Sequence, residues 1–158
     1  IKHYFDAVDR QVLLEIIGRK IKDDNIIHLI TLILNNFKGN EGMPLGNFTS
    51  QFFANIYLNE LDYFVKHHLK AKFYIRYVDD FIILDRDKEL LYNYKEKIGY
   101  FIKNYLKIEL HKDKSKIISL KNGITFLGYR TFYYYKLLRK INLRKFERIF
   151  EEKINLFK

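Results

Sequence analysis

The sequence contains no cysteine and no tryptophan, and it has one proline and one methionine among 158 residues. Without cysteine the chain cannot form disulfides or cysteine-based zinc sites. No apolar run reaches the roughly 18 residues of a membrane span, and no signal-peptide pattern is present. Hydrophobic residues make up 48% of the chain, which supports a core and excludes general disorder. We therefore expect one folded domain, or a piece of a larger protein cut internally at Ile1, without membrane contact.

Positive charge is concentrated at one end of the chain. The sequence carries 29 Lys and Arg against 19 Asp and Glu, which gives a net charge of +10. Residues 1–102 hold 14 basic and 14 acidic residues, whereas residues 103–158 hold 15 basic and 5 acidic residues. A basic end beside a neutral body indicates a polyanion partner, most often nucleic acid. The alternative is a solubility surface on a lysine-rich protein.

Hydrophobic periodicity predicts an α+β fold. Helices are expected over residues 9–21, 23–37, 50–68 and 87–105 and from residue 142 onward, with N-caps at Asp9, Asp87 and Asn142. Short strands are expected at 1–5, 108–110, 117–120 and 124–132, the last one after an Asn122–Gly123 turn. Three consecutive tyrosines, 133–135, would face both sides of a strand, so at least one is expected in the core. The order indicates a split βαβ-type antiparallel sheet with helices packed on one face.

Two adjacent carboxylates, Asp79 and Asp80, lie between apolar runs at 73–77 and 81–84 that are expected to pair as a hairpin. Adjacent carboxylates repel each other, and a divalent cation offsets that repulsion. Hard oxygen ligands suit Mg²⁺, and paired metal sites drive in-line phosphoryl transfer. The alternative is a polar turn, since aspartate is common in turns.

The residues around the pair favour the first interpretation. The string YIRYVDDFIIL, residues 74–84, resembles the YxDD box of reverse transcriptases. Four further strings resemble boxes of the same family in the same order: IKHYFD at 1–6, GMPLGNFTSQ at 42–51, HKDKSK at 111–116 and FLGY at 126–129. The resemblance implies the palm of an RNA-directed DNA polymerase over residues 1–138, without fingers, and the start of the thumb over 139–158.

The resemblance also implies a set of site residues. Two Mg²⁺ ions, for which Mn²⁺ can substitute, would be bound by Asp79 and Asp80, the catalytic carboxylates. A third, the family's first catalytic Asp, would precede Ile1, so the fragment alone is expected to be inactive. The residues expected to bind the nucleotide are Lys2, Phe5, Leu45, Gly46, Gln51 and Lys114, with Lys116 as second choice for the last. Those expected to bind primer or template are Asn47, Ser50, Phe126, Leu127, Gly128, Tyr129, Arg139 and Lys140. Arg76 either holds a carboxylate or a backbone phosphate or is a surface arginine.

The partners implied by the resemblance are an RNA template, a DNA primer and dNTPs. The implied location is the cytoplasm, for a bacterial or phage-borne enzyme. Leu45 stands where most reverse transcriptases have Gln, and Gln51 follows Ser50 where most have Pro. This form looks like that of error-prone diversity-generating retroelement enzymes, which work with a small basic accessory protein. The alternatives are a group II intron or abortive-infection reverse transcriptase, or a non-catalytic RNA-binding module that keeps the palm fold.

Overall fold

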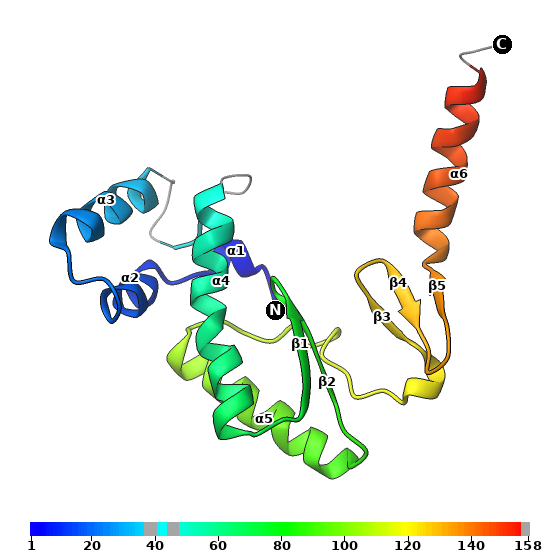
Figure 1. The fold of residues 1–158 in the computed structure, drawn as a ribbon, viewed down its shortest axis with the longest axis horizontal. Helices are drawn as coiled ribbons and strands as arrows, with labels where there is room; N and C mark the ends of the chain where they lie inside the picture. Colours follow the sequence, from blue (N-terminus) through cyan, green and yellow to red (C-terminus); the bar gives the residue numbers. More distant parts are fainter. Residues whose placement is uncertain (37–40, 44–47, 156–158) are drawn as a thin grey trace. The chain divides into compact units, whose positions relative to one another are not determined.

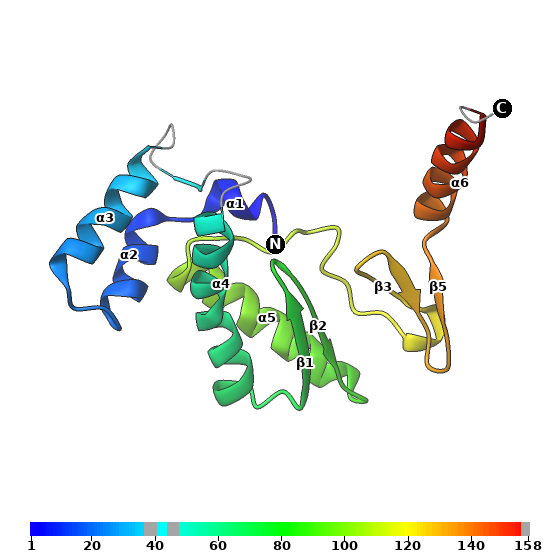
Figure 2. The same cartoon turned by 45° about the horizontal axis from the view of Figure 1, so that its top comes forward.

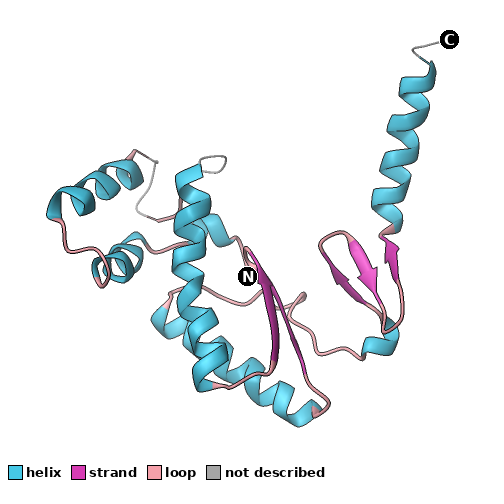
Figure 3. Ribbon diagram, viewed as in Figure 1, coloured by secondary structure: helices cyan, strands magenta, loops and turns pink. Residues whose placement is uncertain are grey.

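The computed structural model describes residues 1–36, 41–43 and 48–155 (Figure 1). The chain divides into two compact units, Ile1–Ser115 and Lys116–Lys158, which are described in turn. The described residues confirm the α+β class, and they form two separate antiparallel sheets, of two and three strands, with no single split βαβ sheet among them. Figure 3 shows the helices and strands of both units. None of the helices in these described ranges is long and apolar enough to cross a membrane.

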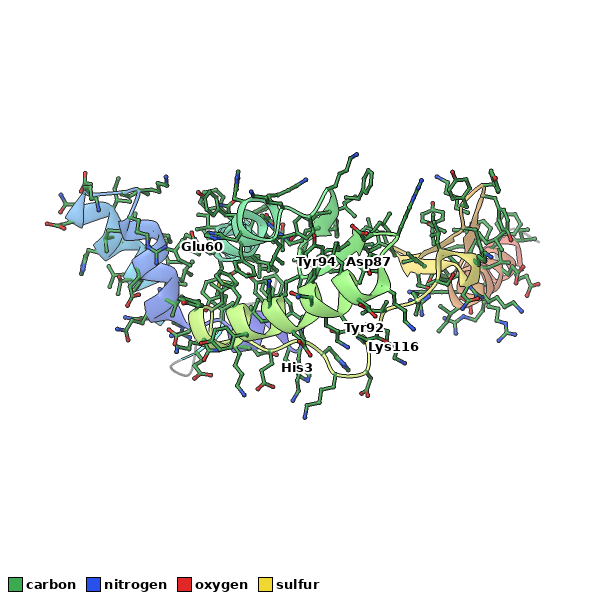
Figure 4. All side chains as sticks on the ribbon, turned by 90° about the horizontal axis from the view of Figure 1, so that it is seen from below. His3, Glu60, Asp87, Tyr92, Tyr94 and Lys116 are labelled. Carbon is green, nitrogen blue, oxygen red and sulfur yellow. The ribbon has the colours of Figure 1, made fainter. Side chains whose placement is uncertain are left out.

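Helices dominate the first unit. They are α1 (Tyr4–Ala7), α2 (Arg10–Gly18), α3 (Asp24–Asn35), α4 (Phe48–Tyr63), the π-helical turn η1 (Phe64–His68) and α5 (Lys88–Tyr105). An aspartate side chain caps the start of α2, α3 and α5, because Asp9, Asp23 and Asp87 each accept a hydrogen bond from a backbone N–H in the first turn. Asp87 is labelled in Figure 4. The predicted caps at Asp9 and Asp87 are therefore confirmed.

The two-stranded sheet is the predicted hairpin. Strand β1 (Phe73–Tyr77) pairs antiparallel with β2 (Asp80–Leu84), and Tyr77 lies opposite Asp80. Figures 1 and 2 both show the hairpin beside α4 and α5. Tyr74, Phe81 and Ile83 pack against the buried core, whereas Tyr77 on the other face is exposed. Strand alternation thus gives the hairpin one core face and one solvent face.

The core of the first unit lies mainly between α2, α4 and α5. Leu13, Leu58, Leu61 and Ile102 are fully buried there. Tyr57 is also fully buried, and its hydroxyl donates a 2.5 Å hydrogen bond to the carbonyl of Leu106, just beyond α5. This bond satisfies a buried polar group and fixes α4 to the end of α5.

Two of the expected strands are wrong in this unit. Residues 1–5 do not form a strand, because His3 adopts a left-handed backbone (φ 43°) and the chain then enters α1. Residues 108–110 do not form one either. Lys107 is left-handed (φ 52°) and the Ile108 N–H bonds back to the Ile102 carbonyl, so the segment terminates α5 instead of pairing with another strand.

The second unit contains η2 (Leu120–Asn122), β3 (Ile124–Phe126), β4 (Tyr129–Thr131), β5 (Lys136–Leu138) and α6 (Lys140–Asn155). The hairpin turn falls at Leu127–Gly128, where both residues have positive φ (49° and 83°), and not at Asn122–Gly123. The expected strand at 117–120 is wrong, since no strand forms there and η2 occupies its last residue. The expected strand at 124–132 is confirmed in part, since β3 and β4 lie within it and the turn divides it in two.

Two further predictions fail in the second unit. Helix α6 begins at Lys140, so Asn142 lies inside it and is not its N-cap. The side-chain Nδ2 of Asn142 instead donates a 3.4 Å hydrogen bond to the Gly128 carbonyl. The three tyrosines at 133–135 lie in the bend between β4 and β5, and all three are exposed. No tyrosine of this run is in the core, because the run is a connection and not a strand.

Candidate active site

The Asp79–Asp80 pair lies at the turn of the β1–β2 hairpin, as predicted. Val78 and Asp79 form the two-residue turn, and Asp80 is the first residue of β2. Asp79 is half-buried and Asp80 is exposed. Val78 has a left-handed backbone (φ 52°), which a β-branched residue adopts only where its surroundings hold it there.

The beginning of the chain lies against this turn. The Ile1 nitrogen donates a hydrogen bond of 3.3 Å to the carbonyl of Asp79. The N–H of Lys2 donates to the Glu109 carbonyl at 3.0 Å. The first two residues therefore lie between the hairpin turn and the segment after α5. Lys2, whose side chain is exposed, directly follows the residue that contacts Asp79.

Arg76, on β1, is the polar centre of the site. Its Nε and Nη2 atoms bind both carboxylate oxygens of Asp62 on α4, at 2.7 and 2.5 Å. Its Nη1 donates to the Val78 carbonyl at 2.8 Å. Burial alone would lower the pKa of Arg76, but the hydrogen bonds and charge of Asp62 outweigh burial and raise it. Arg76 thus holds a carboxylate, and its side chain is only 10% exposed, so it is not a surface arginine.

Tyr4, on α1, packs beside this cluster. Its side chain is buried, and the hydroxyl donates a 2.6 Å hydrogen bond to the Ala54 carbonyl on α4. Burial raises the pKa of Tyr4, and the charges of Tyr57 and Asp79 act in the same direction, against an opposing effect of Arg76. The hydroxyl therefore stays protonated and keeps its bond to α4.

Phe5 contacts residues 42–43, the start of the 42–51 segment that is expected to bind the nucleotide. Phe5 is half-buried, packs edge-on against Tyr4 and lies against the core. Its carbonyl accepts a 2.8 Å hydrogen bond from the Met43 N–H. Arg10 is buried and donates from Nε to the Gly42 carbonyl at 2.9 Å. Residues 42–43 are therefore held beside Phe5 by the Phe5 carbonyl and by the Arg10 side chain.

The remaining expected site residues fall in three places. Leu45, Gly46 and Asn47 lie outside the described residues. On α4, Ser50 is buried and Gln51 is exposed, so Gln51 is the one accessible to a ligand. Lys114 is exposed in the first unit. The second unit holds Lys116, Phe126, Leu127, Gly128, Tyr129, Arg139 and Lys140.

The donor set at the turn suits a divalent cation. Asp79 and Asp80 supply hard carboxylate oxygens, which Mg²⁺ and Mn²⁺ prefer. Neither carboxylate forms an ion pair within the described part of the chain, so their negative charge is not neutralised there. Across the same residues, no group of three acidic, histidine or cysteine side chains is gathered. The two aspartates therefore fit part of a metal site.

Several residues of the site were missed from sequence. Asp62 and Asn55 on α4 both bind Arg76, and the Tyr74 hydroxyl donates to Asp62 at 2.6 Å. The available signal was spacing: positions 55 and 62 are seven apart on one helical face, and 74 and 76 share one face of a strand. Nothing in either pattern indicates that the helix and the strand meet.

Comparison with known families assigns the chain to a family. A model of the family described as reverse transcriptase (RNA-dependent DNA polymerase) matches residues 1–131. The chain therefore belongs to the reverse transcriptase family. Members of this family use divalent metal ions and act on an RNA template with nucleotide substrates, which agrees with a paired carboxylate at an accessible turn.

Three curated relatives are similar to this chain. The group II intron-encoded protein LtrA of Lactococcus lactis subsp. cremoris is 29% identical over 200 residues, covering 82% of this chain and 33% of that protein. Protein YkfC of Escherichia coli (strain K12) is 26% identical over 173 residues, covering 82% and 45% respectively. The putative COX1/OXI3 intron 2 protein of Saccharomyces cerevisiae is 22% identical over 189 residues, covering 79% and 22%. The chain thus spans less than half the length of each of these relatives.

Proposed function

We propose that the chain is the palm of a reverse transcriptase and that its gene product copies an RNA template into DNA. The observation that carries this proposal is the Asp79–Asp80 turn, which the structure presents at an accessible hairpin tip against the first residues of the chain. The family match over residues 1–131 supports it. In the proposed reaction the 3′-oxygen of a DNA primer bonds to the α-phosphorus of a dNTP, and the bond to pyrophosphate breaks.

Asp79 and Asp80 would hold the divalent ions of this reaction. Two Mg²⁺ ions, for which Mn²⁺ can substitute, would supply the positive charge that favours the attacking oxygen and the leaving pyrophosphate. A residue bonded to the Ile1 nitrogen would lie beside the Asp79 carbonyl, because that nitrogen is 3.3 Å away. An aspartate there, as the family pattern implies, would provide the third carboxylate.

Other residues would position the substrates. Lys2 would bind the triphosphate, and Phe5 would lie against the sugar, where a bulky ring excludes a 2′-hydroxyl. Gln51 is the accessible member of the helix start for contact with the nucleotide, and Lys114 would neutralise or protonate the leaving pyrophosphate.

The contacts with primer and template are assigned to residues of the 42–51 segment and of the second unit. Residues 126–129, Arg139 and Lys140 would contact the primer–template backbone, and all of them belong to the second unit, residues 116–158, where the basic excess continues. A split into palm (1–138) and thumb (139–158) would divide this unit at the start of α6. Leu45, Gly46 and Asn47 complete the proposed nucleotide and template contacts, whereas the buried side chain of Ser50 would contact the template only if the start of α4 moved.

The subtype rests on two different supports. The relatives named above support a group II intron-like enzyme. The Leu45–Gly46 and Ser50–Gln51 pairs alone support an error-prone diversity-generating retroelement with a small basic accessory protein. A non-catalytic RNA-binding module predicts RNA affinity without metal dependence, and the intact carboxylate pair favours the enzyme.

Primer extension by the full-length gene product tests the proposal. The wild type should extend a DNA primer on an RNA template with dNTPs and Mg²⁺. The Asp79→Asn variant should lose more than about 100-fold of this rate, because even residues behind a metal ligand cost 10–100-fold. Glu96→Gln is the matched control, since Glu96 is an exposed carboxylate on α5, and its rate should equal that of the wild type.

The polymerase and the non-catalytic RNA-binding module predict opposite results in this assay. A rate for Asp79→Asn that equals the control would remove Asp79 from catalysis. RNA binding without any metal-dependent extension by the wild type would favour the RNA-binding module.

A further inference from the structure

The turn that carries Asp79 is held in an unfavourable backbone conformation. Val78 is left-handed (φ 52°), although its branched side chain disfavours that region. Two-residue hairpin turns require such a positive φ, so the pairing of β1 with β2 imposes it on Val78, and neighbouring groups can fix the strained turn further. The groups that do so here bind the carbonyls on either side of the Asp79 α-carbon.

One of these carbonyls is held by Arg76. The Val78 carbonyl, in the peptide that leads into Asp79, accepts a 2.8 Å hydrogen bond from Nη1 of Arg76. The Asp79 carbonyl, in the next peptide, accepts the bond from Ile1 at 3.3 Å. Both peptide planes around Asp79 are therefore fixed, and with them the direction in which its side chain leaves the backbone.

Arg76 is itself fixed from helix α4. Its guanidinium binds both oxygens of Asp62, at 2.7 and 2.5 Å, and the Asn55 side-chain oxygen at 3.2 Å. Tyr74 donates to Asp62 at 2.6 Å. A planar guanidinium that binds a carboxylate with two bonds has a defined orientation, which a lysine cannot reproduce. Arg76 thus links helix α4, which packs in the core, to the carbonyl of Val78 in the turn.

We propose that Arg76 and Asp62 are positioning residues, which hold the Val78 carbonyl and so direct the Asp79 carboxylate toward its divalent cation. The inference rests on the proposed function, in which Asp79 binds the metal. It adds a role for a helix residue, Asp62, that has no place in the chemistry itself.

A purely electrostatic role for Arg76 makes a different prediction. A guanidinium near Asp79 repels a cation, so removing its charge would strengthen metal binding, and keeping its charge would leave binding unchanged. A positioning role predicts weaker binding whenever the two-bond geometry is lost, whether or not the charge is kept. Arg76→Lys separates the two, because it keeps the charge and loses the geometry.

The experiment is NMR on the isotopically labelled chain with Mn²⁺ as the probe. In the metal-free state, Arg76→Lys should move the amide signals of residues 78–80 and speed their hydrogen exchange. Paramagnetic broadening at Asp79 and Asp80 should then require about 10-fold more Mn²⁺ than in the wild type, as for other residues behind metal ligands. Asp62→Asn should act in the same direction.

Arg19→Lys is the matched control. Arg19 forms a single 3.0 Å ion pair with Glu60, which also lies on α4 and is labelled in Figure 4, and its side chain is 62% exposed. This substitution should leave residues 78–80 and their Mn²⁺ dependence unchanged.

The outcomes distinguish the inference from the proposed function. Unchanged signals at 78–80 in Arg76→Lys, with the fold intact, overturn the positioning role whether or not the metal binds. Absent broadening at Asp79 in the wild type counts against the proposed function, and the metal-free shifts still decide the inference. If Arg76→Lys fails to fold, Asn55→Ala and Tyr74→Phe replace it, since each removes one bond to the pair; unmoved signals at 78–80 in both overturn the role.

Discussion

Among the described glycines of the first unit, Gly42 is the position where one added methyl group should be most damaging. It has φ +82°, and a Cβ built there would lie 3.0 Å from the carbonyl oxygens of both Phe5 and Asp6. These neighbours are backbone atoms and cannot rotate away. We therefore predict that Gly42→Ala destabilises the chain although it adds apolar surface.

The magnitude follows from two effects. A left-handed conformation costs a non-glycine residue roughly 1–2 kcal/mol. The steric overlap also displaces residues 42–43, which make bonds of 2.8 Å from the Gly42 N–H to Val8 and from the Met43 N–H to Phe5. Losing one such bond costs about 0.5–1.5 kcal/mol. The free energy of unfolding should therefore fall by about 2–3 kcal/mol.

Urea unfolding of the chain, followed by far-ultraviolet circular dichroism, measures this change. Gly99→Ala is the matched control, because Gly99 lies within α5 and a Cβ there would meet the nearest atom, Leu110 Cδ1, at an ordinary 3.8 Å. That substitution should stabilise the chain by up to about 1 kcal/mol, the usual helical advantage of alanine over glycine. Opposite signs for the same chemical change are the expected result.

The reasoning would be refuted if Gly42→Ala unfolded at the wild-type urea concentration. Such a result would mean that the segment at 42–43 can move without loss, and that the backbone contacts with Phe5 and Val8 do not fix it. The strain assigned to the positive φ would then be absent.

Two further predictions concern pH and salt. Burial raises the pKa of three hydrogen-bonded tyrosines above the ordinary value of 10.0, namely Tyr4, Tyr57 and Tyr74. Their neutral forms are favoured in the folded state, so their contribution to stability is complete below pH 10 and should fall as the pH rises further; Tyr74→Phe should reduce this alkaline loss in urea titrations, and an equal loss in both proteins would contradict the assignment. For salt, charge reversal at Arg139 and Lys140, both exposed, should reduce the slope of log affinity for nucleic acid against log salt by about 1.4–1.8. Reversal at the exposed α5 residues Lys95 and Lys97 should leave the slope unchanged, and an equal effect of both pairs would place the binding surface elsewhere.

Local sequence signals were sufficient where a structure depends on neighbouring residues. The caps at Asp9 and Asp87 need only the first turn of their own helix, and both were predicted. The hairpin at 73–84 needs two apolar runs and a short polar connection, and it was predicted with Asp79 at its turn. The expected α+β class follows from the same periodicities.

Local sequence signals failed where a residue far along the chain, or a residue with a left-handed backbone, decides the structure. Residues 1–5 alternate like a strand, but His3 turns the chain into α1 and Tyr4 is buried against α4. Asn122–Gly123 is a strong turn signal, yet the turn forms at Leu127–Gly128, where the paired strands on both sides support it. The Arg76–Asp62 pair joins a strand to a helix, and no spacing within either element reveals that contact.

The bond between Ile1 and Asp79 joins residues that are 78 positions apart. The hairpin itself closes over a few residues and can form within microseconds, whereas closing a long chain segment costs entropy that grows with its length. The carboxylates can therefore be displayed early in folding on a turn whose surroundings are still missing. The surroundings of the carboxylates are complete only when residues 1–2 lie against the turn, so a long-range contact finishes what the local hairpin begins. A metal ion that binds only the finished turn would consequently report the docking of residues 1–2 against the hairpin, and not formation of the hairpin alone.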